Sequence, residues 1–426
     1  MRYREELGVA DDATRTLAAR AGGLLGEAGR RAFAHEDMPA AMNLLDRALR
    51  LLDPADPSRL ELERELSRAL WWSGEVARAD ALLDDLIEAA GAVGDSRQQW
   101  YARVERASRR TVAVGGEAEV DALLDTAAEA IPVFESLGDE AGLARAWGRI
   151  SIAHQLRLRY GAGEEAAARA LAHARSAAER QEEGRAVDSL CTCLLNGPTP
   201  ADEAIVRCEE MLEQTRDSRI VEANVSISLA GLLAMVGRFD EARALAARAE
   251  ATYDELGARL ALAGWTQVAG PLELLAGDAS AAERHLRRGF EVLDGVGEQG
   301  YQALLLAEAL VELGEIEEAH RVAALAPERV DDIAAQALAH RVRARIAAER
   351  SPERHDEALA RARRAVELAS ATDALNLWGD SLVGVARVLA RAGRDGEADD
   401  TLREAAGVYR RKGNVVAVER SAARIP

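Results

Sequence analysis

Apolar residues recur along this chain at intervals of three or four positions, and no stretch shows the sustained alternation typical of a half-buried strand. Residues 235–257 and 275–297 show the pattern well: a glycine near the start, an alanine-rich amphipathic run, and a glycine at the end. Such spacing puts the apolar side chains on one side of a helix, which must pack against a neighbour. The pattern therefore predicts an all-α protein.

The same phrase is repeated, and its frame is Gly-x-x-x-x-Ala. The glycine and alanine pairs are Gly74 and Ala79, Gly161 and Ala166, Gly237 and Ala242, Gly277 and Ala282, Gly314 and Ala319, and Gly393 and Ala398, with His35 replacing the glycine before Ala40. Gly237 and Gly277 lie 40 residues apart, and Gly314 follows 37 residues later. A period near 40 residues predicts about ten units over the chain.

Small residues also recur seven positions before the glycine, at Ser67, Ala230, Gly270, Ala307 and Ala386. Small side chains let two antiparallel helices approach closely, so each unit is expected to be a helix, a tight turn and a second helix. The period resembles that of HEAT arrays, whereas the spacing resembles tetratricopeptide repeats, whose usual period is about 34. We favour a right-handed superhelical solenoid of about ten tetratricopeptide-like hairpins with lengthened helices.

The expected organisation has three parts: an N-terminal stub over residues 1–13, the repeat array over 14–412, and a capping helix over 413–426. Pro271 falls within a predicted helix, where proline removes a hydrogen bond and kinks the backbone. We therefore expect a bend in the array near residues 271–327.

Charge and composition narrow the range of partners. Lys and Arg total 54 against 73 for Asp and Glu, giving a net charge of −19, which disfavours nucleic acid and anionic membranes. The N-terminus lacks the apolar segment of a secretory signal, and no run reaches the ~20 apolar residues of a membrane span. We expect a cytoplasmic protein that binds neither nucleic acid nor membrane; the sequence leaves its oligomeric state open.

Residues for catalysis, metals or cofactors do not form a recognisable set. Lys412 is the only lysine and lies outside any phosphate-binding loop pattern. Ser381 belongs to a Gly-Asp-Ser-Leu stretch inside a predicted helix, whereas a nucleophilic serine needs an exposed turn and a histidine base. Cys191, Cys193 and Cys208 match no zinc spacing. We therefore expect a protein that is not an enzyme and carries neither metal nor cofactor.

A stripe of arginine and aromatic residues is the candidate binding site. In tetratricopeptide arrays the first helix of each hairpin lines the concave surface, where ligands usually dock. Counting back from the glycines, with Gly116 as reference in the third unit, predicts these inward positions: Arg64, Arg68, Trp71, Arg103, Arg106, Arg110, Gln155, Arg159 and Asn224. Arginine binds carboxylates in a bidentate fashion and stacks on aromatic rings. The stripe predicts an acidic peptide ligand, and the alternative is that these arginines pair with acidic residues of the chain itself.

Several segments also resemble a known family, namely "AGRRAFAHEDMPAAMNLLDRAL", "AIPVFESLGDEAGLARAW", "NGPTPADEAIVRCEEMLE", "AERHLRRGFEVLD" and "YRRKGNVVAVERSAA". In this order they are similar to the C-terminal tetratricopeptide-repeat region of bacterial signalling proteins in which an adenylate/guanylate cyclase domain and a P-loop ATPase precede the repeats. The resemblance covers nearly the whole chain and implies a regulatory arm without the cyclase or the ATPase.

Two functions remain open at this point. The first is a non-enzymatic scaffold that binds a protein or peptide in its concave groove, as a sensor or regulatory part of a signalling protein. The second is an excised or trans-acting regulatory domain that controls a cyclase, an ATPase or a transcriptional output.

Overall fold

The computed structural model describes residues 12–34, 37–215, 218–293, 300–327 and 332–423. Across these ranges the chain forms α-helices, one 3-10 helix and no strand. The described helices pair in order into ten hairpins and one final helix, as the repeat predicts. Parts of the predicted stub and of the capping segment, and the turn residue His35, lie outside the described residues.

The chain divides into two compact units, residues 1–146 and 147–426, and the division falls within helix α8. The helices of unit 1 are α2 (Asp12–Ala34), α3 (Met38–Leu51), α4 (Arg59–Trp72), α5 (Val76–Val93), α6 (Ser96–Val114), α7 (Glu117–Leu137) and the start of α8 (Glu140–Leu156). Unit 2 begins with the rest of α8 and continues with α9 (Tyr160–Ser176), α10 (Arg180–Asn196), α11 (Ala201–Gln214), α12 (Arg219–Met235), α13 (Phe239–Leu256), α14 (Arg259–Ala276), α15 (Ala279–Val292) and α16 (Gly300–Glu312). It ends with α17 (Ile316–Ala323), α18 (Ile333–Arg350), the 3-10 helix η1 (Pro352–Arg354), α19 (His355–Ser370), α20 (Leu375–Arg391), α21 (Asp395–Lys412) and α22 (Val415–Ala422).

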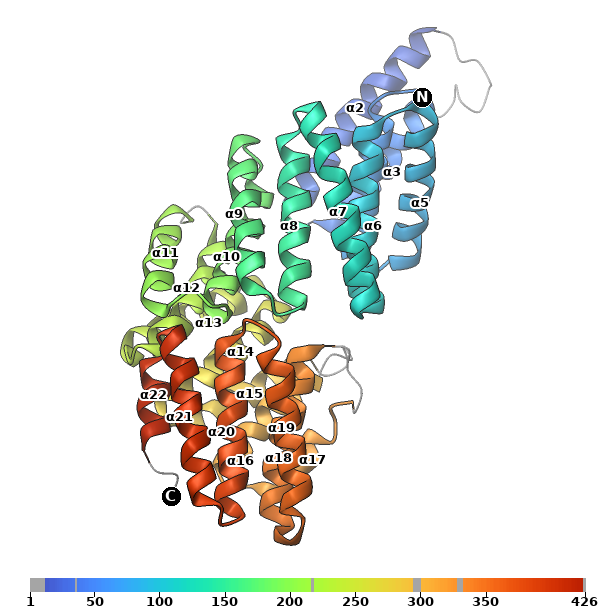
Figure 1. Ribbon diagram of the computed structural model, residues 1–426. Coiled ribbons are helices and arrows are strands. Elements are labelled where there is room, and N and C mark those ends of the chain that lie inside the picture. The colour runs from blue at the N-terminus through green and yellow to red at the C-terminus, as the bar shows by residue number, and fades with distance from the viewer. Residues whose placement is uncertain (1–11, 35–36, 216–217, 294–299, 328–331, 424–426) are drawn as a thin grey trace. The chain divides into compact units, whose positions relative to one another are not determined.

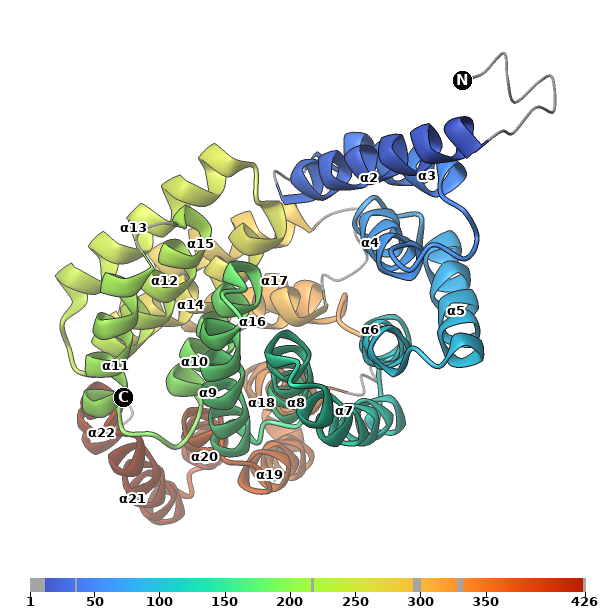
Figure 2. The ribbon, with the colours of Figure 1, turned by 90° about the horizontal axis from the view of Figure 1, so that it is seen from above.

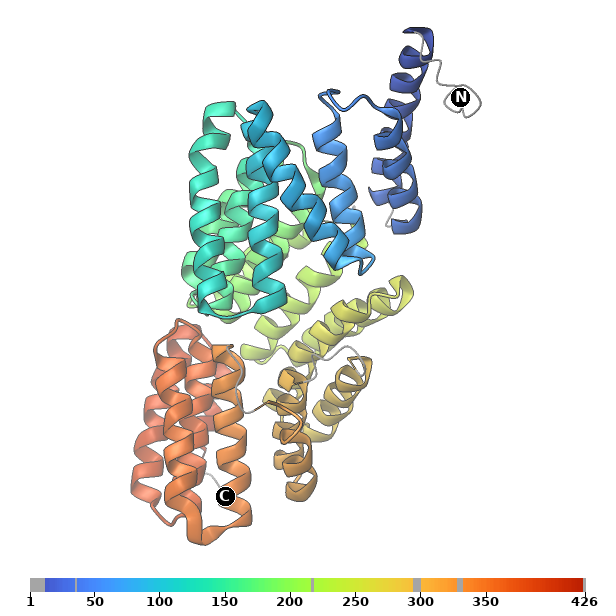
Figure 3. The ribbon, with the colours of Figure 1, turned by 90° about the vertical axis from the view of Figure 1, so that its right-hand side faces the viewer.

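Each hairpin packs its two helices side by side and antiparallel, which Figure 1 shows for both units and Figure 3 shows clearly for α18 to α21. The small positions lie where the two helices meet. A β-carbon added at Gly270 would lie 2.5 Å from Cγ of Leu286 on α15. Ser67 is fully buried, and its hydroxyl donates to the Ala79 carbonyl at 2.8 Å. The predicted close approach of paired helices is thus confirmed at these positions.

Most of the predicted turn glycines adopt a left-handed backbone, which an L-residue rarely accepts. These glycines are Gly74, Gly237, Gly277, Gly314 and Gly393. The fourth hairpin is an exception. There Leu158 has φ 52°, while Gly161 lies inside α9. The frame at Gly161 and Ala166 was therefore wrong by three residues.

A pair of equivalent hydrogen bonds confirms the corrected frame. Ser151 donates to the Gly163 carbonyl at 2.8 Å, as Ser67 does to Ala79, and both bonds span twelve residues. Gly163, rather than Ala166, thus occupies the alanine position of this hairpin.

Pro271 lies within α14, and the helix continues on both sides of it. The bend expected near residues 271–327, part of which lies outside the described residues, remains a prediction. Among the described helices, none is both long and apolar enough to cross a bilayer.

Candidate binding site

The first helices of the hairpins lie along one side of unit 1. Figure 2 shows α4 and α6 on this side and α5 and α7 on the other. We call the surface formed by α4, α6 and the unit 1 part of α8 the A-helix face. Six of the predicted site residues belong to these helices: Arg64, Arg68 and Trp71 to α4, and Arg103, Arg106 and Arg110 to α6.

Arg64 is a buried cation between α4 and α6. Its side chain comes from α4, and the residue is only 7% exposed. Its Nε donates to Oε1 of Gln98 on α6 at 3.2 Å, and its guanidinium lies 4.7 Å from the centroid of the Tyr101 ring. Its Nη1 is buried without a hydrogen-bond partner. Burial, followed by the nearby charge of Arg145, lowers the pKa of Arg64.

Tyr101 connects α6 with the start of α8. The guanidinium of Arg145 lies 4.8 Å from its ring centroid, so two arginines contact one aromatic ring. Its hydroxyl donates to Oδ1 of Asp139 at 3.0 Å, and Oδ2 of Asp139 pairs with Arg97 at 3.0 Å. Burial is the main cause that raises the pKa of the tyrosine hydroxyl. The ring is therefore held in one position between the two cations.

The nearest carboxylates of this face already have a cation. Arg30 on α2 binds Oε1 of Glu65 at 2.9 Å and lies 3.6 Å from Oε2 of Glu61. Burial raises the pKa of Glu65, and the charge of Arg30 opposes that shift. Glu65 is bonded to Arg30, and no carboxylate forms a hydrogen bond with the buried Nη1 of Arg64 among the described residues.

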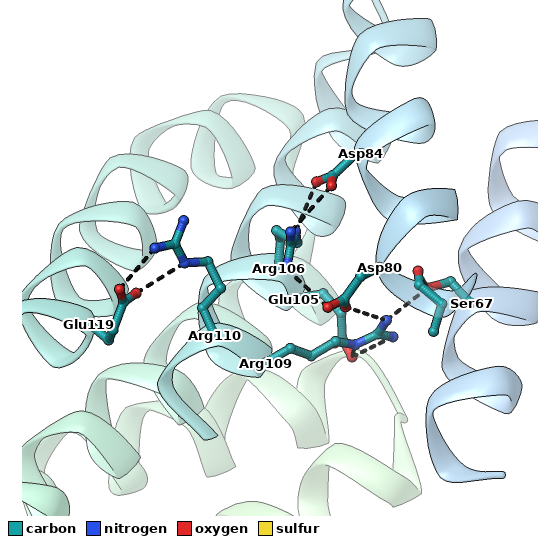
Figure 4. A network of polar contacts seen from close by, with 9 residues as sticks. Ser67, Asp80, Asp84, Glu105, Arg106, Arg109, Arg110 and Glu119 are labelled. Atoms are coloured by element: carbon teal, nitrogen blue, oxygen red, sulfur yellow. Dashed lines mark hydrogen bonds and ion pairs between the residues drawn. The ribbon is translucent and has the colours of Figure 1, made fainter. Parts of the chain in front are cut away.

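A second network of arginines and carboxylates crosses from α4 and α6 to α5 and α7 (Figure 4). Arg109 is 3% exposed; its Nη1 donates to the Ser67 hydroxyl at 2.9 Å, and its guanidinium lies 5.0 Å from the Trp71 ring centroid. It also lies 3.2 Å from Oε1 of Glu105 and 3.7 Å from Oδ1 of Asp80. Arg109 thus links α4 and α6, which are the first helices of two neighbouring hairpins.

Arg106 and Arg110 face the second helices of the hairpins, as Figure 4 shows. Arg106 binds Oδ1 of Asp84 at 2.8 Å and Oδ2 of Asp80 at 3.2 Å, both on α5. Arg110 binds Glu119 on α7 through two nitrogens, at 2.9 and 3.1 Å. Ion pairing within the chain, the alternative considered for the stripe, is what the structure shows for these two residues.

The direction of these side chains follows from the position of the turn. Both Gly115 and Gly116 have positive φ, and the third unit was framed on Gly116. One residue turns a side chain by about 100° around a helix. Arg109, one position before Arg110, therefore points in another direction and donates to the Ser67 hydroxyl, whereas Arg110 binds Glu119.

The two remaining predicted arginines of unit 1, Arg68 and Arg103, contact aromatic rings. Arg68 lies 4.8 Å from the Phe33 ring centroid, and the exposed Arg103 lies 4.9 Å from that of Trp100. Cation–π contacts of this kind hold a guanidinium in place over the ring.

The other three predicted residues belong to unit 2. Gln155 donates to the Ser151 hydroxyl at 3.1 Å, and Arg159 is exposed directly before α9. Asn224 accepts a hydrogen bond of 2.8 Å from the Tyr253 hydroxyl. Burial raises the pKa of the neighbouring Asp188 carboxyl to about 6, and a hydrogen bond with Asn224 opposes the shift. These residues form contacts of their own within unit 2.

Three residues of these networks were not predicted from the sequence: Tyr101, Arg109 and Arg145. Tyr101 directly follows Trp100 in an arginine-rich helix, which is a usable signal for an aromatic platform. Arg145 gives no comparable signal, because only the packing of α8 on α6 brings it to the ring.

The motifs set aside as non-catalytic are buried. Ser381 is 0% exposed, and its hydroxyl donates to the Leu377 carbonyl of its own helix at 2.7 Å. Cys191, Cys193 and Cys208 are free thiols within the packed interior, where burial raises the pKa of Cys193 to about 12. A thiol with a raised pKa is a poor nucleophile at neutral pH.

Comparison with known proteins defines the class of fold. No protein-family model matches the chain, and no curated protein sequence matches it. The apo form of the quorum sensor NprR from B. thuringiensis is similar, with 13% identity and a TM-score of 0.50 over 82% of this chain and 98% of that chain. A Rap protein complexed with competence and sporulation factor is similar with 10% identity and a TM-score of 0.50, over 92% and 98% of the two chains. These likenesses show a helical-hairpin solenoid of the tetratricopeptide type.

Proposed function

We propose that this protein is a non-enzymatic scaffold whose A-helix face binds an acidic segment of a protein or peptide. The observation that carries the proposal is the buried guanidinium of Arg64, whose Nη1 has no hydrogen-bond partner. A buried donor left unpaired costs about 1–3 kcal/mol. A carboxylate of the partner satisfies this donor and also lies close to Arg145.

The positive charges around Arg64 favour a negatively charged group of the partner, such as a peptide carboxylate. Arg64 and Arg145 both contact the Tyr101 ring, so the positive charges are concentrated at one place on three consecutive first helices. Arg68 and Arg103 add exposed or half-buried guanidinium groups on the same two helices. The Rap structure contains a bound factor, which supports the idea that a fold of this type accommodates such a partner.

The test uses a fluorescently labelled octaglutamate peptide as probe and measures its anisotropy with the full chain. We expect Arg64→Met to weaken binding by about 10-fold or more, because a hydrogen bond to a charged group contributes about 1.5–3 kcal/mol. Methionine keeps much of the apolar contact with Tyr101. Circular dichroism checks that the variant is folded.

Arg110→Met is the matched control. It removes the same charge from a residue that is already paired with Glu119 and whose side chain is 54% exposed. Equal affinity of wild type and Arg64→Met would remove the A-helix face as the binding site. Equal loss in both variants would show a general charge effect rather than a site.

A second candidate function is a regulatory domain that acts on a cyclase, an ATPase or a transcriptional output. The ordered segments that resemble the repeat region of cyclase–ATPase proteins support it. The discriminating measurement adds the purified chain to such a cyclase–ATPase protein and follows ATP hydrolysis and cyclic nucleotide formation. Unchanged rates at saturating chain would favour the independent scaffold.

A further inference from the structure

The last helices of unit 2 contact helices that come much earlier in the unit, and three charged side chains take part in this contact. Asp373 lies in the loop before α20, Lys412 ends α21, and Arg420 lies on α22. Their partners lie between 145 and 218 residues earlier in the chain. Figure 1 shows α21 and α22 below α11 and α12, and α12 contacts α22. Each of the three side chains reaches one end of a helix.

Asp373 caps the first turn of α9. Its Oδ1 accepts from the Tyr160 amide at 2.7 Å and its Oδ2 from the Gly161 amide at 2.8 Å, while its own amide donates to the Leu158 carbonyl at 3.2 Å. The residue directly before α9, Arg159, provides no side-chain cap. A carboxylate at this end also complements the positive end of the helix dipole.

Lys412 caps the C-terminal end of α10. The residue is 0% exposed, and its Nζ donates to the Leu194 carbonyl at 2.7 Å and to the Thr199 carbonyl at 2.8 Å. Leu194 belongs to the last turn of α10, whose carbonyls have no partner within the helix. A cation at a helix C-terminus is electrostatically favourable.

Arg420 repeats this arrangement at α14. Its Nη1 donates to the carbonyls of Leu274 and Leu275, the latter at 3.1 Å, and both residues lie in the last turn of that helix. Three helix ends formed by the early hairpins are therefore capped by the last ones, each with the sign of charge that the helix dipole favours.

The apolar clusters of unit 2 follow the order of the chain instead. One cluster is formed by buried residues of α9 to α14, and another by buried residues of α20 to α22, with Leu275 packed against both. The contact between these helices thus combines the polar caps with the side chain of Leu275 and with the close approach of Gly413 to Ala201. Each cluster is formed mainly by consecutive helices, so separation of the two ends would leave most of each cluster in place.

We propose that residues 373–420 form a releasable clasp, which closes unit 2 through the helix-end caps of Asp373, Lys412 and Arg420. With the clasp engaged, the first and last hairpins of unit 2 are joined. With the clasp released, each hairpin contacts only its neighbours in sequence, as in an open solenoid.

The test is hydrogen–deuterium exchange, followed by mass spectrometry, on the full chain carrying Lys412→Met or Asp373→Asn. Lys412 makes its hydrogen bonds at residues 194 and 199, and Asp373 makes its bonds at 158–161. In a clasp that opens as a whole, each variant accelerates exchange at both places by about 10-fold or more. The segment 333–350 within α18 should keep wild-type exchange.

Arg410→Met is the control, because it removes a positive charge from an exposed residue two positions from Lys412. Acceleration confined to the substituted contact, or equal exchange in all variants, would overturn the clasp. If Lys412→Met unfolds unit 2, the Asp373→Asn variant decides through exchange at residues 194–204.

Discussion

Lys412 is the only lysine of the chain, and its ammonium is fully buried. Burial lowers the pKa of this group from 10.5 to about 8, while the charges of Glu164 and Cys208, which face it, act in the opposite direction. The amine donates hydrogen bonds to the Leu194 and Thr199 carbonyls. At the scale of single residues, unit 2 therefore contains an amine whose pKa is lower in the folded chain than in the unfolded chain.

The sign of this effect can be measured. Between pH 8 and pH 10.5 the unfolded chain binds a proton that the folded chain has lost, so folding becomes more favourable as pH rises. We expect the difference in unfolding free energy between wild type and Lys412→Met to grow in favour of wild type across this window. Urea unfolding at pH 7.5, 9 and 10.5 checks it; a difference that shrinks with pH would contradict the prediction.

Asp188 gives the opposite prediction at lower pH. Burial raises the pKa of its carboxyl from 3.8 to about 6, so the folded state becomes less stable as pH rises through that window. Asp188→Asn keeps the shape without the charge. The variant should be more stable than wild type at pH 7 and equal to it near pH 3.5. Urea midpoints at the two pH values measure this, and a pH-independent difference would argue against it.

Part of the candidate site could be predicted from the sequence. The helices that carry it, and Arg64 as a member, followed from the repeat. The directions of Arg106 and Arg110 did not, because both side chains pair with acidic residues of α5 and α7 that the repeat does not single out. The role of Arg145 depends on tertiary packing, which local spacing does not encode.

At the scale of helices, close packing decides where glycine is required. In α14, a β-carbon at Gly270 would lie 2.5 Å from Leu286, whereas a β-carbon at Gly264 meets no atom within 4 Å. Gly270→Ala should therefore destabilise the fold by about 1–3 kcal/mol through overpacking. Gly264→Ala should stabilise it by about 0.5–1 kcal/mol, since alanine favours helix.

Thermal and urea unfolding of the two variants measure the contrast. Because both substitutions lie in one helix and add the same methyl group, general helix propensity cannot give them opposite signs. Two stabilised variants would show that Leu286 moves aside without cost.

The hairpins were predictable because each one repeats a local pattern. Glycine ends a helix, small residues mark the contact, and apolar spacing marks the buried side. The pattern failed at the fourth hairpin, where Leu158 adopts a left-handed backbone without being glycine. Leu158 is only 4% exposed, and it combines this burial with a backbone conformation that is uncommon for residues other than glycine.

At the scale of the whole molecule, net charge opposes the proposed ligand. The chain carries a net charge of −19, so an acidic peptide is repelled at long range and attracted only near the A-helix face. We expect its association rate constant to rise when salt increases from 10 to 150 mM, because the Debye length falls from about 30 to about 8 Å. Stopped-flow anisotropy measures the rate, and a steep fall with salt would indicate attractive steering instead.

The contacts that close unit 2 have no counterpart in the sequence pattern. Asp373 and Lys412 reach residues more than 200 positions away, and nothing in the repeat distinguishes them from solvated charges. Local periodicity predicts which helices pair, but it does not predict contacts between hairpins that are far apart in the sequence.

Because Lys412 is buried, the rate at which its amine is chemically modified measures how often this part of unit 2 opens. A succinimidyl ester acylates an uncharged, accessible amine, and this chain has a single lysine side chain to offer. Its modification rate, read by mass spectrometry on the unaltered protein, counts how often the amine reaches solvent. A ligand that holds unit 2 shut would slow the acylation, and one that holds it apart would speed it, with no label attached beforehand.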